Sequence, residues 1–208
     1  MNHSLKTFLF RDLHTPLSTL AGAGLLIMAS SRLAFGLVTG IALLWVYDIT
    51  VTILFFTQPI YPNIGKKAIL ILLTSFLGSC YLLLLWFFSP LLAMETGYVI
   101  LLVPCYCIGS STFSRINLGQ AKFEKLLFNT SLEAGSLGIL IVAFALIREP
   151  IGFMSLSVPG GPLGIIEVFP VFEGNSFLPI RVIGSSAGAF LLLGYGAALF
   201  RNIKKSNS

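Results

Sequence analysis

Three cysteines are the residues of this sequence best suited to cofactor chemistry, and two of them stand close together. Cys105 and Cys107 flank Tyr106 in the otherwise apolar run 104–109, which begins with proline and ends with glycine. Proline and glycine interrupt membrane helices, and such a break would let both thiols point into the protein. The pair is therefore a candidate metal or cofactor site. A buried free cysteine is also a small hydrophobic packing residue, which is the interpretation we favour for Cys80.

Two acidic side chains fall inside apolar stretches and are candidates for an ion pathway. Asp48 lies in the run 45–50 and Glu133 lies early in the apolar stretch that follows residue 128. A carboxylate at the bilayer centre costs at least ~2.5 kcal/mol, so it marks a functional candidate. For both acids a structural hydrogen bond and a role in ion passage stay open. Arg148 and Glu149 are expected to form a charge network at a helix end.

Other kinds of catalytic site have no counterpart in the sequence. It contains no nucleotide-binding glycine motif, no Ser-His-Asp arrangement and no His-Glu metal motif, and its only histidines are His3 and His14. A self-contained enzyme is therefore not expected. Basic residues do not gather in a patch with interleaved aromatic residues, so no nucleic-acid partner is predicted.

The elements that must position these residues are membrane helices. Of 208 residues, 56% are hydrophobic and 10% are charged, and the mean hydropathy is +0.92. Typical soluble chains carry roughly 25% charged residues, and apolar runs of about 18 or more residues match the hydrocarbon thickness of a bilayer. We therefore predict one polytopic, all-α membrane domain over 1–208, in contact with lipid. Its six apolar segments are 17–31, 34–57, 68–90, 97–113, 128–147 and 182–200.

The distribution of lysine and arginine predicts the orientation. Cytoplasmic loops carry an excess of positive charge, and six spans divide the cations ten to three. The ten are Lys6, Arg11, Lys66, Lys67, Arg115, Lys122, Lys125, Arg201, Lys204 and Lys205, and the three are Arg32, Arg148 and Arg181. Both termini are thus expected in the cytoplasm, and the net charge of +5 reflects topology. The first 16 residues lack a signal-peptide layout. The Gly- and Pro-rich stretch 150–179 is expected to be an ordered, partly interfacial excursion.

The segments also suggest an internal duplication. The first and fourth are short or interrupted by glycine and proline, and each is followed by two stronger ones. Three spans per half require the two three-helix repeats to be inverted, an arrangement in which interrupted helices commonly build an ion or substrate site.

Several stretches resemble the six-helix membrane subunits of the Rnf/Nqr redox-driven ion pumps, most closely the RnfE/NqrD type. Cys105 and Gly109 keep the spacing between the family's fourth-segment cysteine and glycine. The strongest similarity runs from the stretch 133–135 through an apolar helix to the Arg-Glu pair and glycine turn of 147–152. The stretch 186–194 resembles the family's entry to its last helix.

The resemblance implies a bacterial inner-membrane subunit of an ion-translocating electron transport complex that moves sodium ions or protons. It also implies pairing with an inverted-topology paralogous subunit. In such a pair, each subunit contributes two thiolates to an intramembrane two-iron two-sulfur cluster, because that cluster needs four ligands. The family's first-segment cysteine would fall within residues 20–26, and no cysteine precedes Cys80. Either Cys107 replaces that ligand beside Cys105, or the chain is a cluster-free scaffolding or transport subunit. A small transporter or permease component is the alternative from another class.

Overall fold

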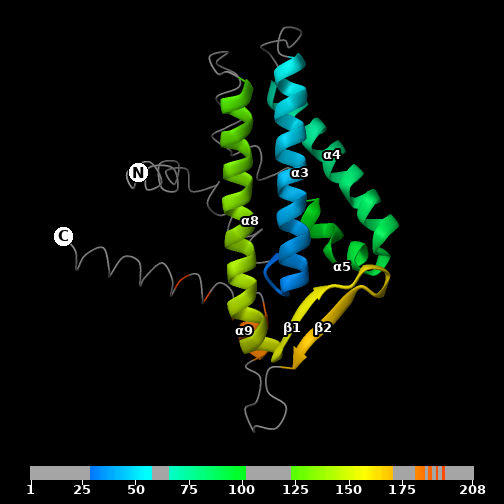
Figure 1. Ribbon diagram of the computed structural model, residues 1–208, viewed down its shortest axis with the longest axis vertical. Helices are drawn as coiled ribbons and strands as arrows, with labels where there is room; N and C mark the ends of the chain where they lie inside the picture. The colour runs from blue at the N-terminus through cyan, green and yellow to red at the C-terminus, as the bar shows by residue number, and fades with distance from the viewer. Residues whose placement is uncertain are drawn as a thin grey trace, which may run out of the picture.

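The computed structural model describes residues 29–57, 66–101, 123–170, 181–185, 187, 188, 191 and 194 (Figure 1). Three of its helices are long and apolar enough to cross a membrane: α3 (Leu33–Thr57), α4 (Lys66–Phe88) and α8 (Phe123–Phe153). A span of about 20 apolar residues is what the hydrocarbon core requires. The membrane class predicted from composition is therefore supported by the helices themselves.

The predicted segments 34–57, 68–90 and 128–147 correspond to α3, α4 and α8. The prediction was wrong about the ends of the last one, because α8 begins at Phe123 and continues through Pro150 to Phe153. Proline is tolerated there because only one further turn follows, and Met154 then ends the helix in the left-handed region at φ 54°. The segments 17–31, 97–113 and 182–200 lie largely outside the described residues, so the six spans and the repeat stay predictions.

Helix α5 (Pro90–Ile100) corrects the predicted start of the fourth segment. That segment was expected to begin at residue 97, but α5 begins at Pro90, after a break at Ser89 that separates it from α4. Its 11 residues extend about 16 Å, roughly half the hydrocarbon thickness. Ile100 at its end is completely buried and packs with Val38 and Ala42 of α3.

Helices α3 and α8 run antiparallel and form the closest helix pair of the fold (Figure 1). Gly40, in the first third of α3, meets Gly138 at the middle of α8, where a Cβ added to Gly138 would lie 3.3 Å from the Cα atom of Gly40. Glycine at both positions lets the two backbones approach, as is common between membrane helices. Helix α4 packs on α3 as well, and the Tyr81 hydroxyl donates a hydrogen bond to the carbonyl oxygen of Val38 at 3.0 Å.

A β-hairpin follows α8 and is an addition to the all-α architecture predicted from the sequence. Strands β1 (Ser155–Pro159) and β2 (Ile165–Pro170) pair antiparallel with a bulge at Val168 of β2, and the short 3-10 helix η2 (Gly161–Leu163) forms the turn. The turn rests on the α4–α5 corner, where the Ser89 hydroxyl donates to the Gly161 carbonyl oxygen. The described part of the predicted excursion thus packs on helices of its own chain. Helix α9 (Arg181–Gly184) lies beside the end of α8.

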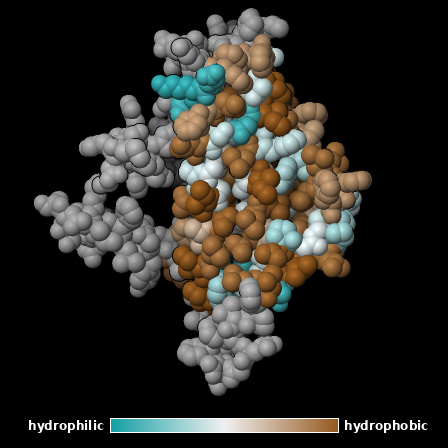
Figure 2. Space-filling view, viewed as in Figure 1, coloured by the Kyte–Doolittle hydropathy of each residue, from teal (hydrophilic) through white to brown (hydrophobic). Residues whose placement is uncertain are grey.

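Different elements form the two ends of the helix group. The hairpin, the start of α3 and the end of α8 gather at one end (Figure 1), while the starts of α4 and α8 lie at the opposite end. Between them, apolar residues dominate the visible surface (Figure 2). Large apolar side chains of α4 point outward, among them Leu72, Phe76, Leu83 and Phe87. Such a surface is suited to lipid tails.

Candidate functional site

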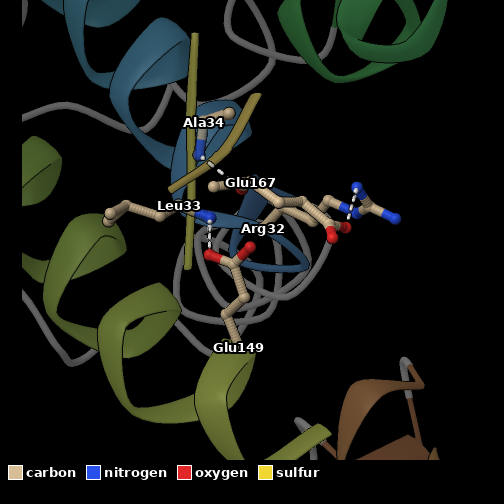
Figure 3. Close-up of polar contacts among 6 residues, drawn as sticks. Arg32, Leu33, Ala34, Glu149 and Glu167 are labelled. Atoms are coloured by element: carbon tan, nitrogen blue, oxygen red, sulfur yellow. Dashed lines mark hydrogen bonds and ion pairs between the residues drawn. The ribbon is translucent and has the colours of Figure 1, made fainter. Parts of the chain in front are cut away.

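A group of polar contacts between distant parts of the chain lies where α8 ends and α3 begins (Figure 3). We call the residues Arg32, Leu33, Ala34, Glu149, Ser157 and Glu167 the helix junction. Glu149 is 0% exposed, and its Oε2 atom accepts a hydrogen bond of 2.7 Å from the backbone N–H of Leu33. The first N–H groups of a helix have no partner within the helix, and a carboxylate there is stabilised by the helix dipole. Glu149 therefore caps α3 from a distant part of the chain.

Two further contacts bring the hairpin to the helix junction. The Ser157 hydroxyl of β1 accepts a 3.5 Å hydrogen bond from the N–H of Ala34, the next free donor of α3. On β2, Glu167 forms an ion pair of 3.8 Å with Arg32, whose guanidinium also lies over the Phe153 ring. This ion pair is partly exposed and contributes little. The hairpin thus completes the cap of α3 and closes the end of the bundle.

Arg148 joins three segments beside the helix junction. Its guanidinium donates to the Ser30 hydroxyl at 3.1 Å and to the Gly184 carbonyl oxygen of α9 at 2.6 Å, and the residue is 2% exposed. A buried charge is tolerated only when it is hydrogen-bonded. The expected charge network is therefore at the predicted helix end, but it is buried, and its partners include backbone and hydroxyl groups.

One carboxylate oxygen of Glu149 takes no part in these hydrogen bonds. Its Oε1 atom is buried and has no hydrogen-bond partner among the described residues. A buried acceptor without a partner costs about 1–3 kcal/mol, and in native proteins such atoms commonly bind water or an ion. The helix junction is therefore able to accept one more donor or cation.

Asp48 lies on α3 against α8, inside the apolar spans. Its Oδ1 atom accepts a 2.8 Å hydrogen bond from the Ser131 hydroxyl, which lies two residues before Glu133 on α8. Glu133 is half-buried on the same helix, and Ser136 bonds its backbone carbonyl oxygen. The structure thus brings Asp48 to the helix that carries Glu133. Both the structural and the ion-passage interpretation of these acids stay open.

The cysteine predictions fall mostly outside the structure. Cys105 and Cys107 lie outside the described residues, whereas Cys80 is a half-exposed free thiol on α4. Among the described residues, no three His, Cys, Asp or Glu side chains are grouped as metal ligands. Helix α5 ends at Ile100, five residues before Cys105.

Sequence reasoning did not single out Ser30 and Ser131, which bond the charged Arg148 and Asp48, or Ser157, which accepts from the N–H of Ala34. Serine is too common in every kind of segment for its type to signal a role. Only alternation in the short strand Ser155–Pro159, which buries Ser155 and Ser157, hinted that these hydroxyls face inward.

Comparisons with protein-family models, with curated proteins and with solved structures give no match for this chain.

Proposed function

We propose that the chain is a membrane subunit of an Rnf/Nqr-like ion-translocating electron transport complex in a bacterial cytoplasmic membrane, with both termini in the cytoplasm. It works there beside an inverted-topology paralogous subunit and other subunits of the complex. One observation carries the proposal. The stretch with the strongest resemblance, from Glu133 to Gly152, forms a single membrane helix whose Arg-Glu pair is buried at the start of α3.

The burial of the Arg148–Glu149 pair supports this proposal, because it gives the pair a role inside the bundle. A helix-end pair that only improved solubility would face water, whereas Arg148 and Glu149 are almost completely buried and bond residues 30, 33 and 184. Residues 30 and 33 near the start of α3 and residue 184 of α9 are far from the pair in the sequence. A role in holding the segments of the subunit together explains why charge is retained in an apolar bundle.

A two-iron two-sulfur cluster needs four thiolates, and this chain has three cysteines, of which Cys80 lies half-exposed on α4. The chain alone therefore cannot supply the full ligand set. Cys105 and Cys107 are the thiolates that it would contribute, and a paired subunit would contribute the other two. Such a cluster would accept and release one electron at a time within the membrane.

The test is the iron and acid-labile sulfide content of the anaerobically purified complex, together with EPR of the reduced sample. Wild type is compared with Cys105→Ser and Cys107→Ser, and Cys80→Ser is the matched control. We expect a two-iron signal in wild type and in the control, and its loss in both other variants. An unchanged signal in Cys107→Ser removes that residue as a ligand. Equal iron in all forms removes the cluster and leaves the scaffolding role.

The second candidate is a small transporter or permease component, which the Asp48–Ser131 contact favours. A carboxylate held by a hydroxyl between two membrane helices is a common element of proton and ion pathways. In this case Asp48→Asn abolishes ion or solute uptake in reconstituted vesicles while Cys105→Ser has no effect. The opposite pattern supports the electron-transport subunit.

A further inference from the structure

Asp48 is a carboxylate on the outer side of a membrane-spanning helix. Its Oδ1 atom accepts the hydrogen bond of 2.8 Å from Ser131, and no other donor reaches its carboxylate within the part of the chain that the structure describes. No ion pair joins Asp48 to a cation among those residues. The side chain is half-buried and is not sealed in the core. Its carboxylate is therefore open to a group from outside the α3–α8 pair.

The depth of Asp48 in the membrane makes this opening costly. Helix α3 has 25 residues and is about 38 Å long, so when it is centred about 4 Å extends beyond each face of a hydrocarbon core about 30 Å thick. Asp48 lies nine residues before Thr57, the last residue of α3, and thus about 10 Å inside that core. An aspartate side chain is too short to reach the headgroups from there. A carboxylate at such a depth normally has a polar or charged partner.

The surface around Asp48 is otherwise apolar or small. Leu44, one turn earlier on the same side of α3, is exposed, and so is Ile41. On α8, Gly135 lies one turn after Ser131 on the same side, and a Cβ added there would meet nothing within 4 Å. Because α3 and α8 run antiparallel (Figure 1), the position of Leu44 corresponds to that of Gly135. We call Ile41, Leu44, Asp48, Ser131 and Gly135 the Asp48 face.

We propose that the Asp48 face binds a membrane helix of a neighbouring subunit that carries a lysine or arginine, and that Asp48 pairs with this cation. Charge complementarity argues for such an occupant, because lipid tails offer a carboxylate no donor. The open space at Gly135 lets a second backbone approach closely, as is common between membrane helices. A second copy of this chain fits less well, because a two-fold contact centred on this face would bring one Asp48 to the other.

The cation is expected from a neighbouring chain. Lys125 is the described cation nearest to Ser131 along α8, but it lies six residues earlier and is turned about 120° away around the helix. Asp48 is in the half of α3 nearer the end of the bundle that carries Lys125, the end predicted to be cytoplasmic. Lysine and arginine concentrate beside the cytoplasmic ends of membrane helices, and their long side chains extend along apolar surfaces. The inference rests on the proposed function only in requiring that the chain works in an assembly.

Site-specific photo-crosslinking in native membranes tests the occupant. p-Benzoylphenylalanine replaces Leu44 in the full-length chain, and mass spectrometry identifies the linked peptide. The same replacement of Leu72, which is exposed on α4, is the matched control. We expect Leu44, and not Leu72, to link to a membrane helix of another protein that has a lysine or arginine within about two turns of the linked residue. An adduct at Leu44 with lipid alone, with a second copy of this chain, or with a helix lacking a basic residue would overturn the proposal.

The contribution of the charge is measured in the same assay. Asp48→Asn keeps the acceptor for Ser131 but removes the charge, so we expect the yield of the adduct at Leu44 to fall at least about tenfold. Glu133→Gln is the control, because Glu133 lies two residues from Ser131 and so on the opposite side of α8. A yield that Asp48→Asn leaves unchanged would show that Ser131 alone satisfies the acid.

The identity of the linked peptide is read in a chain that keeps Asp48, so this part of the test stands even where Asp48→Asn fails to insert. Neither readout depends on iron or on electron transfer. A basic partner helix in a complex without a two-iron signal supports the Asp48 face and removes the cluster. An adduct with lipid alone in a complex with that signal removes the Asp48 face as an interface and leaves the electron-transport subunit in place.

Discussion

At the scale of single residues, the helix junction shows how a buried acid is retained in an apolar bundle. Glu149 accepts a backbone hydrogen bond that α3 cannot satisfy within itself, and Ser157 serves the next donor. Arg148 meanwhile bonds a hydroxyl and a carbonyl oxygen on either side. Each charge is held by polar groups from other segments, so removing either one leaves partners unsatisfied as well.

Replacing Glu149 by alanine tests this account. The change leaves the N–H of Leu33 buried without an acceptor, so we expect the free energy of unfolding to fall by about 1–3 kcal/mol. Glu133→Ala is the control, because Glu133 is half-buried on the same helix. Thermal or denaturant unfolding in detergent micelles measures both variants. If the two lose the same stability, the cap contributes nothing beyond helix composition.

At the scale of elements, close packing of α3 on α8 brings polar groups of the two helices together. Glycine meets glycine at positions 40 and 138, and Gly36 faces Ala145 and Ile141 on the next turn. This close approach lets Ser131 reach Asp48 at one end of the pair and Glu149 reach Leu33 at the other. The spacing between the helices is therefore coupled to both polar contacts.

Gly138→Val is expected to push the two helices apart. A Cβ at this position already lies 3.3 Å from the Cα atom of Gly40, and backbone cannot move aside as a side chain can. Overpacking of this kind costs about 1–3 kcal/mol. Gly135→Val, three residues earlier, meets nothing within 4 Å and is the matched control. Unfolding in micelles compares them, and equal stabilities would show that the glycine contact is not limiting.

At the scale of the whole molecule, the antiparallel spans sort charge to the two ends. Lys66 and Lys67 begin α4 and Lys125 lies in the first turn of α8, while Arg32 and Arg148 lie at the hairpin end. The lysine-rich end corresponds to the side predicted to be cytoplasmic. On this orientation the hairpin and the helix junction face the opposite side of the membrane.

Side-specific labelling tests the orientation. Leu163→Cys lies at the exposed tip of the hairpin and Lys125→Cys at the exposed start of α8. A membrane-impermeant thiol reagent added to intact cells should modify Leu163→Cys and should reach Lys125→Cys only after permeabilisation. Wild type, with its native cysteines, gives the background. The reverse pattern would show that the chain is inserted with the hairpin in the cytoplasm.

The sequence by itself determined the membrane class and the positions of three spans, because an apolar run of membrane length has few other stable environments. It also located Asp48, Glu133 and the Arg148–Glu149 pair, since charges within apolar runs are conspicuous. It did not predict the hairpin, whose strands are short and follow a Gly- and Pro-rich stretch.

Only the tertiary structure decided which groups these charges meet. The partners of the Arg148–Glu149 pair are Ser30, Leu33 and Gly184, which lie 36 to 118 residues away in the sequence. Distance along the chain therefore gives no sign of these contacts. Hydrogen bonding depends on the positions of atoms in space, and packing of α3 against α8 fixes those positions.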